Sequence, residues 1–410
     1  MSTKLQFRSP SARPGDVPDF SQFHVSAPGE LPVPDLRFDA VNPWKYATGL
    51  IRVLDSEGNA TGPWADYLGD DGDDNAILLG LKDIMKMRAI DARMQNAQRQ
   101  GKITFYLQCT GEEAIGSGFQ RMLSSGDMNF PTYRQPILLI AADYPLQSLL
   151  GQLYSNQLDP LQGRQLPTMH SARDYGFFTI SGNLGTQYVQ SVGWAMANAL
   201  TNNSKIAAGW IGDGATASND FHSALLSASV YKPPVVLNIV NNQWAISTYS
   251  GIASGNGVTF AARGIGYGLP AIRVDGNDYL AVLAASKWAI ARARKGYGPT
   301  IIEWLTYRAA AHSTSDDPSA YRPKNEADAW PLGDPLDRLK THAIKQGIWS
   351  KERHTQAEAE FIAEVKEVQK EVEAHGTLID PASMSPAGIF RGVYEKIPPH
   401  LNRQRQEMGY

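Results

Sequence analysis

The stretch Ile206-Ala207-Ala208-Gly209-Trp210-Ile211-Gly212-Asp213-Gly214 decides the fold of this 410-residue chain. Its first six residues are apolar or small, which is typical of a strand buried on both faces of a sheet. The glycines allow a sharp turn, and residues Ser218 to Tyr231 have the composition of a helix that ends before Pro233. The stretch therefore predicts a strand, a tight turn and a helix, from which parallel α/β sheets are built.

The same alternation continues along the central part of the chain. Further strands are predicted at 235–240, 272–274 and 300–307, and helices at 259–267 and 279–295. Strands that alternate with helices indicate an α/β fold, a mostly parallel, doubly wound sheet with helices on both faces.

The chain ends differ from this central part in composition. Residues 1–75 are rich in Pro, Gly and Asp, which favours an extended N-terminal arm that lies on a partner over an independent domain. We expect the α/β domain to span residues 76–330 and to begin with a helix over about 77–100. Beyond it, the charged sequence of 331–410 predicts a helical C-terminal extension packed on the same domain.

Charge and cysteine content exclude several classes of protein. The 38 Lys and Arg residues against 41 Asp and Glu give a net charge of −3, and no basic run indicates a nucleic-acid partner. No apolar run reaches the ~18 residues that a membrane-spanning helix needs. The single cysteine, Cys109, cannot form an internal disulfide. Because no secretory or import segment is recognisable either, we expect a cytoplasmic protein.

Gly212-x-Gly214-x-x-Ala217 fits the dinucleotide fingerprint loosely, which leaves a nicotinamide-dependent oxidoreductase as an alternative. Two features argue against it. The Asp213 carboxylate would crowd a bare pyrophosphate, and the next strand ends in Asn241-Asn242 without the acidic residue that holds a ribose. A divalent cation between Asp213 and a phosphate would remove the conflict, because Mg²⁺ binds one or two side chains together with phosphate oxygens.

The end of the second strand supplies a matching oxygen donor. Asn242 follows the strand at 235–240, and neighbouring parallel strands deliver the residues after them to one edge of the sheet. Only 26 residues separate Gly214 from Asn241, since 240 − 214 = 26, which is room for one helix and one strand. The sequence therefore predicts one magnesium ion between Asp213 and Asn242.

Gly212-Asp213-Gly214 followed at this spacing by Asn241-Asn242 resembles the thiamine diphosphate motif of transketolases, pyruvate decarboxylases and 2-oxo acid dehydrogenases. Five flanking segments are similar to the alpha subunit of the heterotetrameric 2-oxo acid dehydrogenase decarboxylating component. They are 98–103, Gly111-Glu112-Glu113, Tyr133-Arg134, 163–167 and Tyr307-Arg308. Within that family, segments 262–268 and 312–322 resemble the branched-chain members. The resemblance covers residues ~77 to ~395 and implies the thiamine diphosphate-binding fold.

The resemblance also implies a cofactor site. Asp213, Asn242 and the backbone carbonyl of Trp244 would ligate Mg²⁺. Tyr133 and Arg134 match a pair that binds the diphosphate, for which a guanidinium is well suited. Further cofactor-binding positions are Gly182, Gly212, Gly214 and Ala215. Val240 stands where some relatives have an arginine, so one cationic contact is absent.

The segment Ser181-Gly182-Asn183-Leu184-Gly185-Thr186-Gln187 resembles the loop that supports this cofactor. Leu184 would be the apolar wedge beneath it. Ser181, Thr186, Gln187 and the Asn183 carbonyl match a site for a structural monovalent cation such as K⁺. A polar turn without an ion is the alternative.

His312 is the candidate catalytic acid or base, because it follows a strand at the expected ligand edge. In relatives, this histidine contacts the diphosphate, and Ser313 matches a site of regulatory phosphorylation.

The implied reaction is oxidative decarboxylation of branched-chain 2-oxo acids, with acyl transfer to the lipoyl group of an acyltransferase component. The glutamate that activates the cofactor in this family comes from the beta subunit, so we expect two alpha and two beta chains that share active sites. Two further functions stay open at this point: the alpha subunit of a pyruvate or acetoin dehydrogenase, and a non-catalytic scaffold subunit.

Overall fold

The computed structural model describes residues 8–21, 23–38, 43–254, 259–379 and 386–410. Parts of all three predicted regions lie outside these described residues, including 255–258 of the predicted α/β domain. The others are 1–7, 22 and 39–42 of the predicted arm, and 380–385 of the predicted C-terminal extension.

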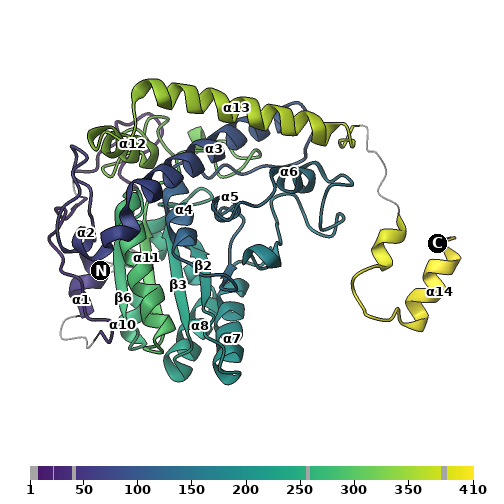
Figure 1. Cartoon of the computed structure of the whole chain (residues 1–410), viewed down its shortest axis with the longest axis horizontal. Coiled ribbons are helices and arrows are strands. Elements are labelled where there is room, and N and C mark those ends of the chain that lie inside the picture. Colours follow the sequence, from purple (N-terminus) through teal and green to yellow (C-terminus); the bar gives the residue numbers. More distant parts are fainter. Residues whose placement is uncertain (1–7, 22, 39–42, 255–258, 380–385) are drawn as a thin grey trace, which may run out of the picture.

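A five-stranded parallel sheet forms the centre of the fold, with the strand order β1-β2-β3-β7-β6 (Figure 1). The strands are β1 (Met128–Phe130), β2 (Ala207–Gly212), β3 (Val235–Asn241), β6 (Ala271–Asp275) and β7 (Thr300–Leu305). The predicted parallel sheet is confirmed. β1 was not predicted, because three residues are too few to show a strand pattern.

Helices cover both faces of this sheet. Alternate residues of each strand point to opposite sides, so Trp210 of β2 packs in one hydrophobic core and its neighbour Ile211 in the other. The first core contains α3 (Asp74–Arg99), α4 (Glu113–Arg121) and α11 (Tyr279–Arg294). The second contains α7 (Thr186–Leu200), α8 (Asn219–Tyr231) and α10 (Arg263–Gly266).

The prediction of a helix at 259–267 is wrong for its first half, residues 259–262. Only Arg263–Gly266 is helical, because side chains bind the backbone N–H groups before it. Glu303 Oε2 accepts from the Ala261 N–H at 2.8 Å, and Thr259 Oγ1 accepts from the Ala262 N–H at 3.1 Å. Side-chain acceptors of this kind compete with the helical hydrogen-bond ladder.

Much of the described N-terminal region packs on the chain's own core. It contains α1 (Pro43–Thr48), α2 (Pro63–Leu68) and a 3₁₀ turn, η1 (Gly69–Gly72). Ile51 forms a parallel bridge with Val274 of β6, and the buried Trp64 ring lies 6.4 Å from that of Trp288 on α11. Burial of such apolar surface holds this region on the sheet domain.

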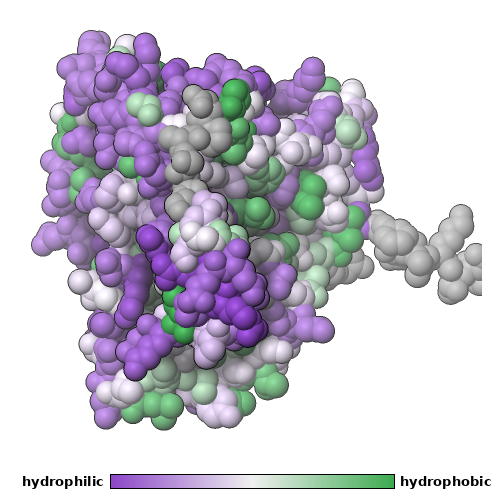
Figure 2. Space-filling view, turned by 90° about the vertical axis from the view of Figure 1, so that its right-hand side faces the viewer, coloured by the Kyte–Doolittle hydropathy of each residue, from purple (hydrophilic) through white to green (hydrophobic). Residues whose placement is uncertain are grey.

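The C-terminal region is helical. α12 (Pro335–Lys345) and α13 (Lys351–Glu373) pack along α3, and α13 also contacts α6 (Leu146–Tyr154), which follows α5 (Ile137–Ala141). η5 (Pro386–Phe390) and α14 (Pro399–Glu407) lie apart from the sheet in Figure 1 and have no buried residue. Figure 2, viewed from that end, shows a mostly hydrophilic surface. Among the described residues, no helix has the length and apolar character needed to cross a membrane.

Candidate functional site

A cavity of about 510 Å³ lies at the C-terminal edge of the sheet. Four adjacent strands deliver side chains to it: Arg134 follows β1, Asp213 follows β2, Asn242 follows β3 and His312 follows β7. This is the edge at which ligands bind in open parallel sheets. Eleven of the predicted residues line the cavity: Tyr133, Arg134, Leu184, Gln187, Gly212, Asp213, Gly214, Ala215, Asn242, Trp244 and His312.

The remaining walls come from short elements after β2 and β3. They are η3 (Gly214–Ala217), β4 (Trp244–Ala245), β5 (Thr248–Tyr249) and α9 (Ser250–Ser254). Several lining side chains in this part of the wall are apolar, including Ile252 of α9 and Ile246, which lies between β4 and β5. A ligand with both an anionic and an apolar part suits such a lining.

Asp213 is the N-cap of η3 and only 2% exposed. Its Oδ1 accepts from the Gly214 N–H at 2.8 Å, whereas its Oδ2 is buried without a hydrogen-bond partner. Burial raises the pKa of Asp213 to about 7. A buried carboxylate oxygen without a partner is costly, and a cation bound at the site would offset that cost.

Gly214 lies against the start of the β4–β5 hairpin. A Cβ added to Gly214 would lie 2.2 Å from the Ala245 Cβ, whereas one added to Gly212 would meet no atom within 4 Å. We therefore expect Gly214→Ala to lower the free energy of unfolding by roughly 1–3 kcal/mol through overpacking. Gly212→Ala is the matched control and should leave it nearly unchanged in chemical denaturation. Equal losses in the two variants would contradict the role of this contact.

Asn242 and Glu112 form a buried pair beside Asp213. Asn242 Nδ2 donates to Glu112 Oε1 at 2.7 Å, and Asn242 Oδ1 accepts from the Trp244 N–H at 3.2 Å. Glu112 is 4% exposed, and its Oε2 is buried without a partner. Burial raises the pKa of Glu112 to about 7, against the opposing effect of Arg134. No sequence pattern indicates that Glu112 reaches this cavity.

Arg134 connects three parts of the site. Its Nη1 donates to the Gln108 carbonyl at 2.6 Å and its Nη2 to the His312 carbonyl at 2.7 Å, while Nε lies 3.7 Å from Glu112 Oε1. Nη2 also lies 3.1 Å from His312 Nδ1. Because a guanidinium only donates, Nδ1 must accept, so the neutral ring carries its proton on Nε2.

His312 is neutral in this environment. Burial, together with the guanidiniums of Arg134 and Arg308, lowers the pKa of His312 to about 4. Its backbone N–H donates to Asp316 Oδ2 at 2.7 Å, and the Tyr321 hydroxyl donates to the same oxygen at 2.7 Å. The imidazole therefore offers an N–H donor at neutral pH on a loop that is fixed at both of these points.

The Trp244 carbonyl, predicted as a metal ligand, accepts from Arg308 Nη1 at 2.9 Å. A carbonyl has a second lone pair, so its role as a ligand stays a prediction. Ser313 is 8% exposed, and its Oγ accepts from the Ser315 N–H. Among the described residues, no cluster of three or more His, Cys, Asp and Glu could hold a metal ion. A metal here would therefore depend on amide, carbonyl or ligand oxygens besides Asp213.

The predicted support loop precedes α7. Leu184 lines the cavity and is 48% exposed, and Gln187 also lines it, whereas Ser181, Gly182, Asn183 and Thr186 do not. Ser181 Oγ accepts from the Asn183 N–H, and Thr186 Oγ1 donates to Asp220 Oδ2 at 3.3 Å. Gln187 Nε2 donates to the Trp210 carbonyl, which leaves its buried Oε1 without a partner. The monovalent-cation site stays a prediction.

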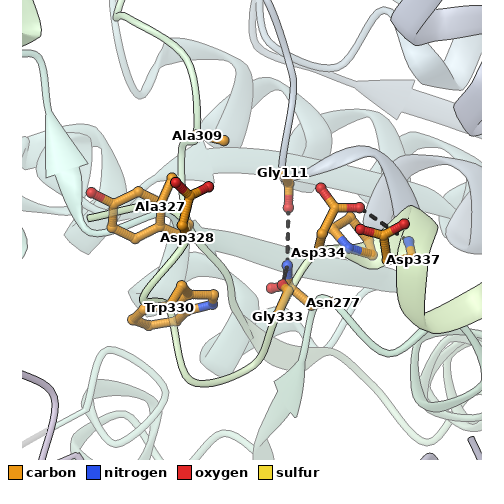
Figure 3. A pocket seen from close by; sticks show the side chains of 11 residues that line it. Gly111, Asn277, Ala309, Ala327, Asp328, Trp330, Gly333, Asp334 and Asp337 are labelled. Atoms are coloured by element: carbon orange, nitrogen blue, oxygen red, sulfur yellow. Dashed lines mark hydrogen bonds between the residues drawn. The ribbon is translucent and has the colours of Figure 1, made fainter. Parts of the chain in front are cut away.

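A second, smaller cavity of about 270 Å³ lies beside Gly111 (Figure 3). Its wall includes Trp330, Asp328 and Asp334, and it shares no lining residue with the larger cavity. The Asn277 side chain donates to the Gly111 carbonyl at 3.4 Å, the contact drawn in Figure 3. This contact helps to fix the backbone just before Glu112.

Asp91 also supports the loop that leads to Glu112. Tyr106 Oη, the Cys109 N–H and Thr110 Oγ1 all donate to its carboxylate, and burial raises the pKa of Asp91 to about 7.

A folded-state pKa above the unfolded value of 3.8 means that the folded chain holds the Asp91 proton more tightly. The stability linked to Asp91 is therefore complete below pH 4 and lost as the pH rises to about 7. The free energy of unfolding of the wild type should therefore fall between pH 5 and pH 7.5. In Asp91→Asn we expect this fall to be smaller, by on the order of 2 kcal/mol. Urea denaturation of the purified chain at these pH values tests this. Identical slopes in the two proteins would contradict it.

Two family models match this chain. The one described as "Dehydrogenase E1 component" matches residues 82–379, and "2-oxoisovalerate dehydrogenase E1 alpha subunit N terminal" matches residues 4–41. The chain belongs to the dehydrogenase E1 component family. The larger match includes every residue that lines the 510 Å³ cavity.

Three E1 relatives are similar over most of their length. The chain is 53% identical to the 2-oxoisovalerate dehydrogenase subunit alpha of Pseudomonas aeruginosa, across 99% of this chain and 98% of that protein. It is 35% identical to the mitochondrial 2-oxoisovalerate dehydrogenase subunit alpha of Mus musculus, across 88% and 79%. It is 38% identical to the pyruvate dehydrogenase E1 component subunit alpha of Acholeplasma laidlawii, across 78% and 89%.

Proposed function

We propose that this E1 chain is the alpha subunit of a branched-chain 2-oxo acid dehydrogenase. The enzyme would decarboxylate branched-chain 2-oxo acids oxidatively and transfer the acyl group to the lipoyl group of an acyltransferase component. The observation that carries the proposal is the delivery of Arg134, Asp213, Asn242 and His312 by four adjacent strands to one cavity. The similarity to alpha subunits named for 2-oxoisovalerate supports the branched-chain class.

The residues present fit thiamine diphosphate and Mg²⁺. The partnerless Oδ2 of Asp213 is a hard anionic donor, and Asn242 Oδ1 is an amide oxygen just after the adjacent strand. Arg134 and Tyr133 supply a guanidinium and an aromatic ring to the same cavity. When bound, the thiazolium ring acts as the electron sink for decarboxylation. Asp213, Asn242 and the Trp244 carbonyl would hold Mg²⁺, and Arg134 the diphosphate.

His312 would donate a hydrogen bond from Nε2 to oxygen atoms of the bound ligands. Substituting His312 by Ala removes this donor and the acceptor at Arg134 Nη2. We expect turnover by the assembled enzyme to fall by roughly 100-fold or more. Steady-state rates against 2-oxo acid concentration provide the measurement. His222→Ala is the control, because His222 lies outside the cavity on α8. Wild-type turnover in the His312 variant would dismiss its role.

Part of the active site would come from another chain. Leu184, Ile246 and Ile252 line the cavity yet are 48%, 55% and 55% exposed, so the cavity has an apolar and accessible rim. Such a rim suits coverage by a partner subunit. We propose a beta subunit as that partner, in an assembly of two alpha and two beta chains. We also propose a cytoplasmic location. Cys109 is buried and forms no disulfide, which fits a reducing compartment.

The test is to express the chain with and without a beta subunit of the proposed class, and to assay both samples. The assembled protein should oxidise 3-methyl-2-oxobutanoate faster than pyruvate, with dependence on thiamine diphosphate and Mg²⁺. The chain alone should be almost inactive. A preference for pyruvate would favour the alternative suggested by the Acholeplasma relative. Dependence on a nicotinamide cofactor, without thiamine diphosphate, would refute the proposed function.

A further inference from the structure

Glu112 lines the cavity without a role in the proposed metal and diphosphate contacts. It follows Gly111, whose φ of +100° is one that residues with a side chain rarely adopt. A Cβ at Gly111 would lie 2.1 Å from the Tyr307 carbonyl oxygen. Asn277 and Thr306 both donate to the Gly111 carbonyl, and Figure 3 shows the first of these bonds. The backbone is therefore held firmly where Glu112 enters the cavity wall.

The carboxylate of Glu112 determines how the Asn242 amide is oriented. An ionised carboxylate only accepts hydrogen bonds, so it must face the NH₂ end of the Asn242 amide, as the 2.7 Å contact shows. The amide oxygen is then turned the other way, where it accepts from the Trp244 N–H. A glutamine at position 112 could donate or accept, and would allow both orientations of the amide.

The same carboxylate is also the counter-ion of Arg134. Glu112 Oε1 lies 3.7 Å from Arg134 Nε, while both terminal nitrogens of this guanidinium are bound to the Gln108 and His312 backbone carbonyls. Arg134 and Glu112 are 5% and 4% exposed, so their attraction is weakly screened by solvent. One carboxylate thus contacts both Asn242 and Arg134.

We propose that Glu112 is a positioning residue that presents the Asn242 oxygen to Mg²⁺ and holds Arg134 for the diphosphate. This inference rests on the proposed function. Groups that orient metal ligands contribute to metal affinity without contacting the metal. Glu112 is accordingly distinct from the catalytic glutamate expected from the beta subunit.

The test uses the assembled alpha–beta protein carrying Glu112→Gln, which keeps the size of the side chain. Cofactor binding is followed by calorimetric titration with thiamine diphosphate at a series of Mg²⁺ concentrations. We expect the half-saturating Mg²⁺ concentration to rise by about 10–100-fold. The thermal midpoint of the cofactor-free assembly should also fall, because the substitution leaves the buried Arg134 guanidinium without its counter-ion. A merely structural role would lower that midpoint and leave the Mg²⁺ dependence unchanged.

The matched control is Asp83→Asn. Asp83 is another buried carboxylate, paired with Arg121 and Ser117 outside the cavity, so its substitution should leave the Mg²⁺ dependence as in the wild type. Glu112→Asp is the second variant: it keeps the charge but shortens the side chain, and should also weaken Mg²⁺-dependent binding. Weaker binding in Glu112→Asp would mean that the length of the side chain, which sets its contact with Asn242, matters as well as its charge.

Each outcome bears on a different claim. If Glu112→Gln and Glu112→Asp both keep wild-type Mg²⁺ dependence, the inference is overturned while the proposed function stands. If the wild-type assembly binds no thiamine diphosphate with Mg²⁺, the proposed function itself fails. If Glu112→Gln does not assemble, the result with Glu112→Asp decides.

Discussion

Asp213→Asn should abolish Mg²⁺-dependent cofactor binding while leaving the folded chain intact. The substitution removes the charge of an oxygen, Oδ2, that has no partner within the described part of this chain. We expect the half-saturating Mg²⁺ concentration to rise by more than about 100-fold, above the range for groups that only orient ligands. Turnover should fall roughly 10³-fold, as when a transition-state charge loses its stabilising group. Calorimetric titration and steady-state rates on the assembled enzyme measure the two effects.

Stability provides the internal control for this variant. Burial of the unpaired carboxylate is unfavourable, so the cofactor-free Asp213→Asn protein should be at least as stable as the wild type at pH 8. A large drop in its thermal midpoint would mean that Asp213 has a structural role. Wild-type Mg²⁺ dependence together with normal folding would contradict its assignment as the metal ligand.

Arg134→Met should cost both cofactor affinity and stability. The guanidinium is the cation best placed to bind a diphosphate, and charge-assisted contacts of this kind are strong. We expect the cofactor dissociation constant to rise about 100-fold or more. The substitution also leaves the Glu112 carboxylate buried without its counter-ion, which should lower the free energy of unfolding by about 3 kcal/mol.

A double variant separates these two losses. Adding Glu112→Gln to Arg134→Met removes the uncompensated buried charge, so the free energy of unfolding should recover in part. Cofactor affinity should not recover, because the guanidinium is still absent. Recovery of both quantities would mean that Arg134 acts on the cofactor only through Glu112. Recovery of neither would contradict the ion pair between them.

Much of the fold could be predicted because its strands are buried on both faces. The run ending at Gly212 has no polar residue and the run at 235–240 has only Asn238, so neither has a polar face, and both strands form as expected. The adjacency of Asp213 and Asn242 followed from this, since neighbouring parallel strands end at one edge. Short elements escaped prediction: β1 has three residues, and the first half of the helix at 259–267 is replaced by side-chain capping.

The site could be predicted only in part, because contacts between distant segments leave no local pattern. Gly111-Glu112-Glu113 was noticeable as a motif, yet nothing in the sequence places Glu112 against Asn242, 130 residues further on. The loop at 181–187 shows the opposite problem. Its residues matched a support loop by resemblance, but only Leu184 and Gln187 of the predicted positions reach the cavity wall. Side-chain direction decides such cases.

One divalent cation that joins Asp213 and Asn242 to a diphosphate is central to the proposed function. A crystal of the alpha–beta assembly grown with thiamine diphosphate and Mn²⁺ in place of Mg²⁺ tests it most directly, through the anomalous scattering of manganese. We predict a single strong peak in each cavity, about 2.1 Å from Asp213 Oδ2 and from Asn242 Oδ1. Bound cofactor with no peak between these two atoms would contradict the assignment.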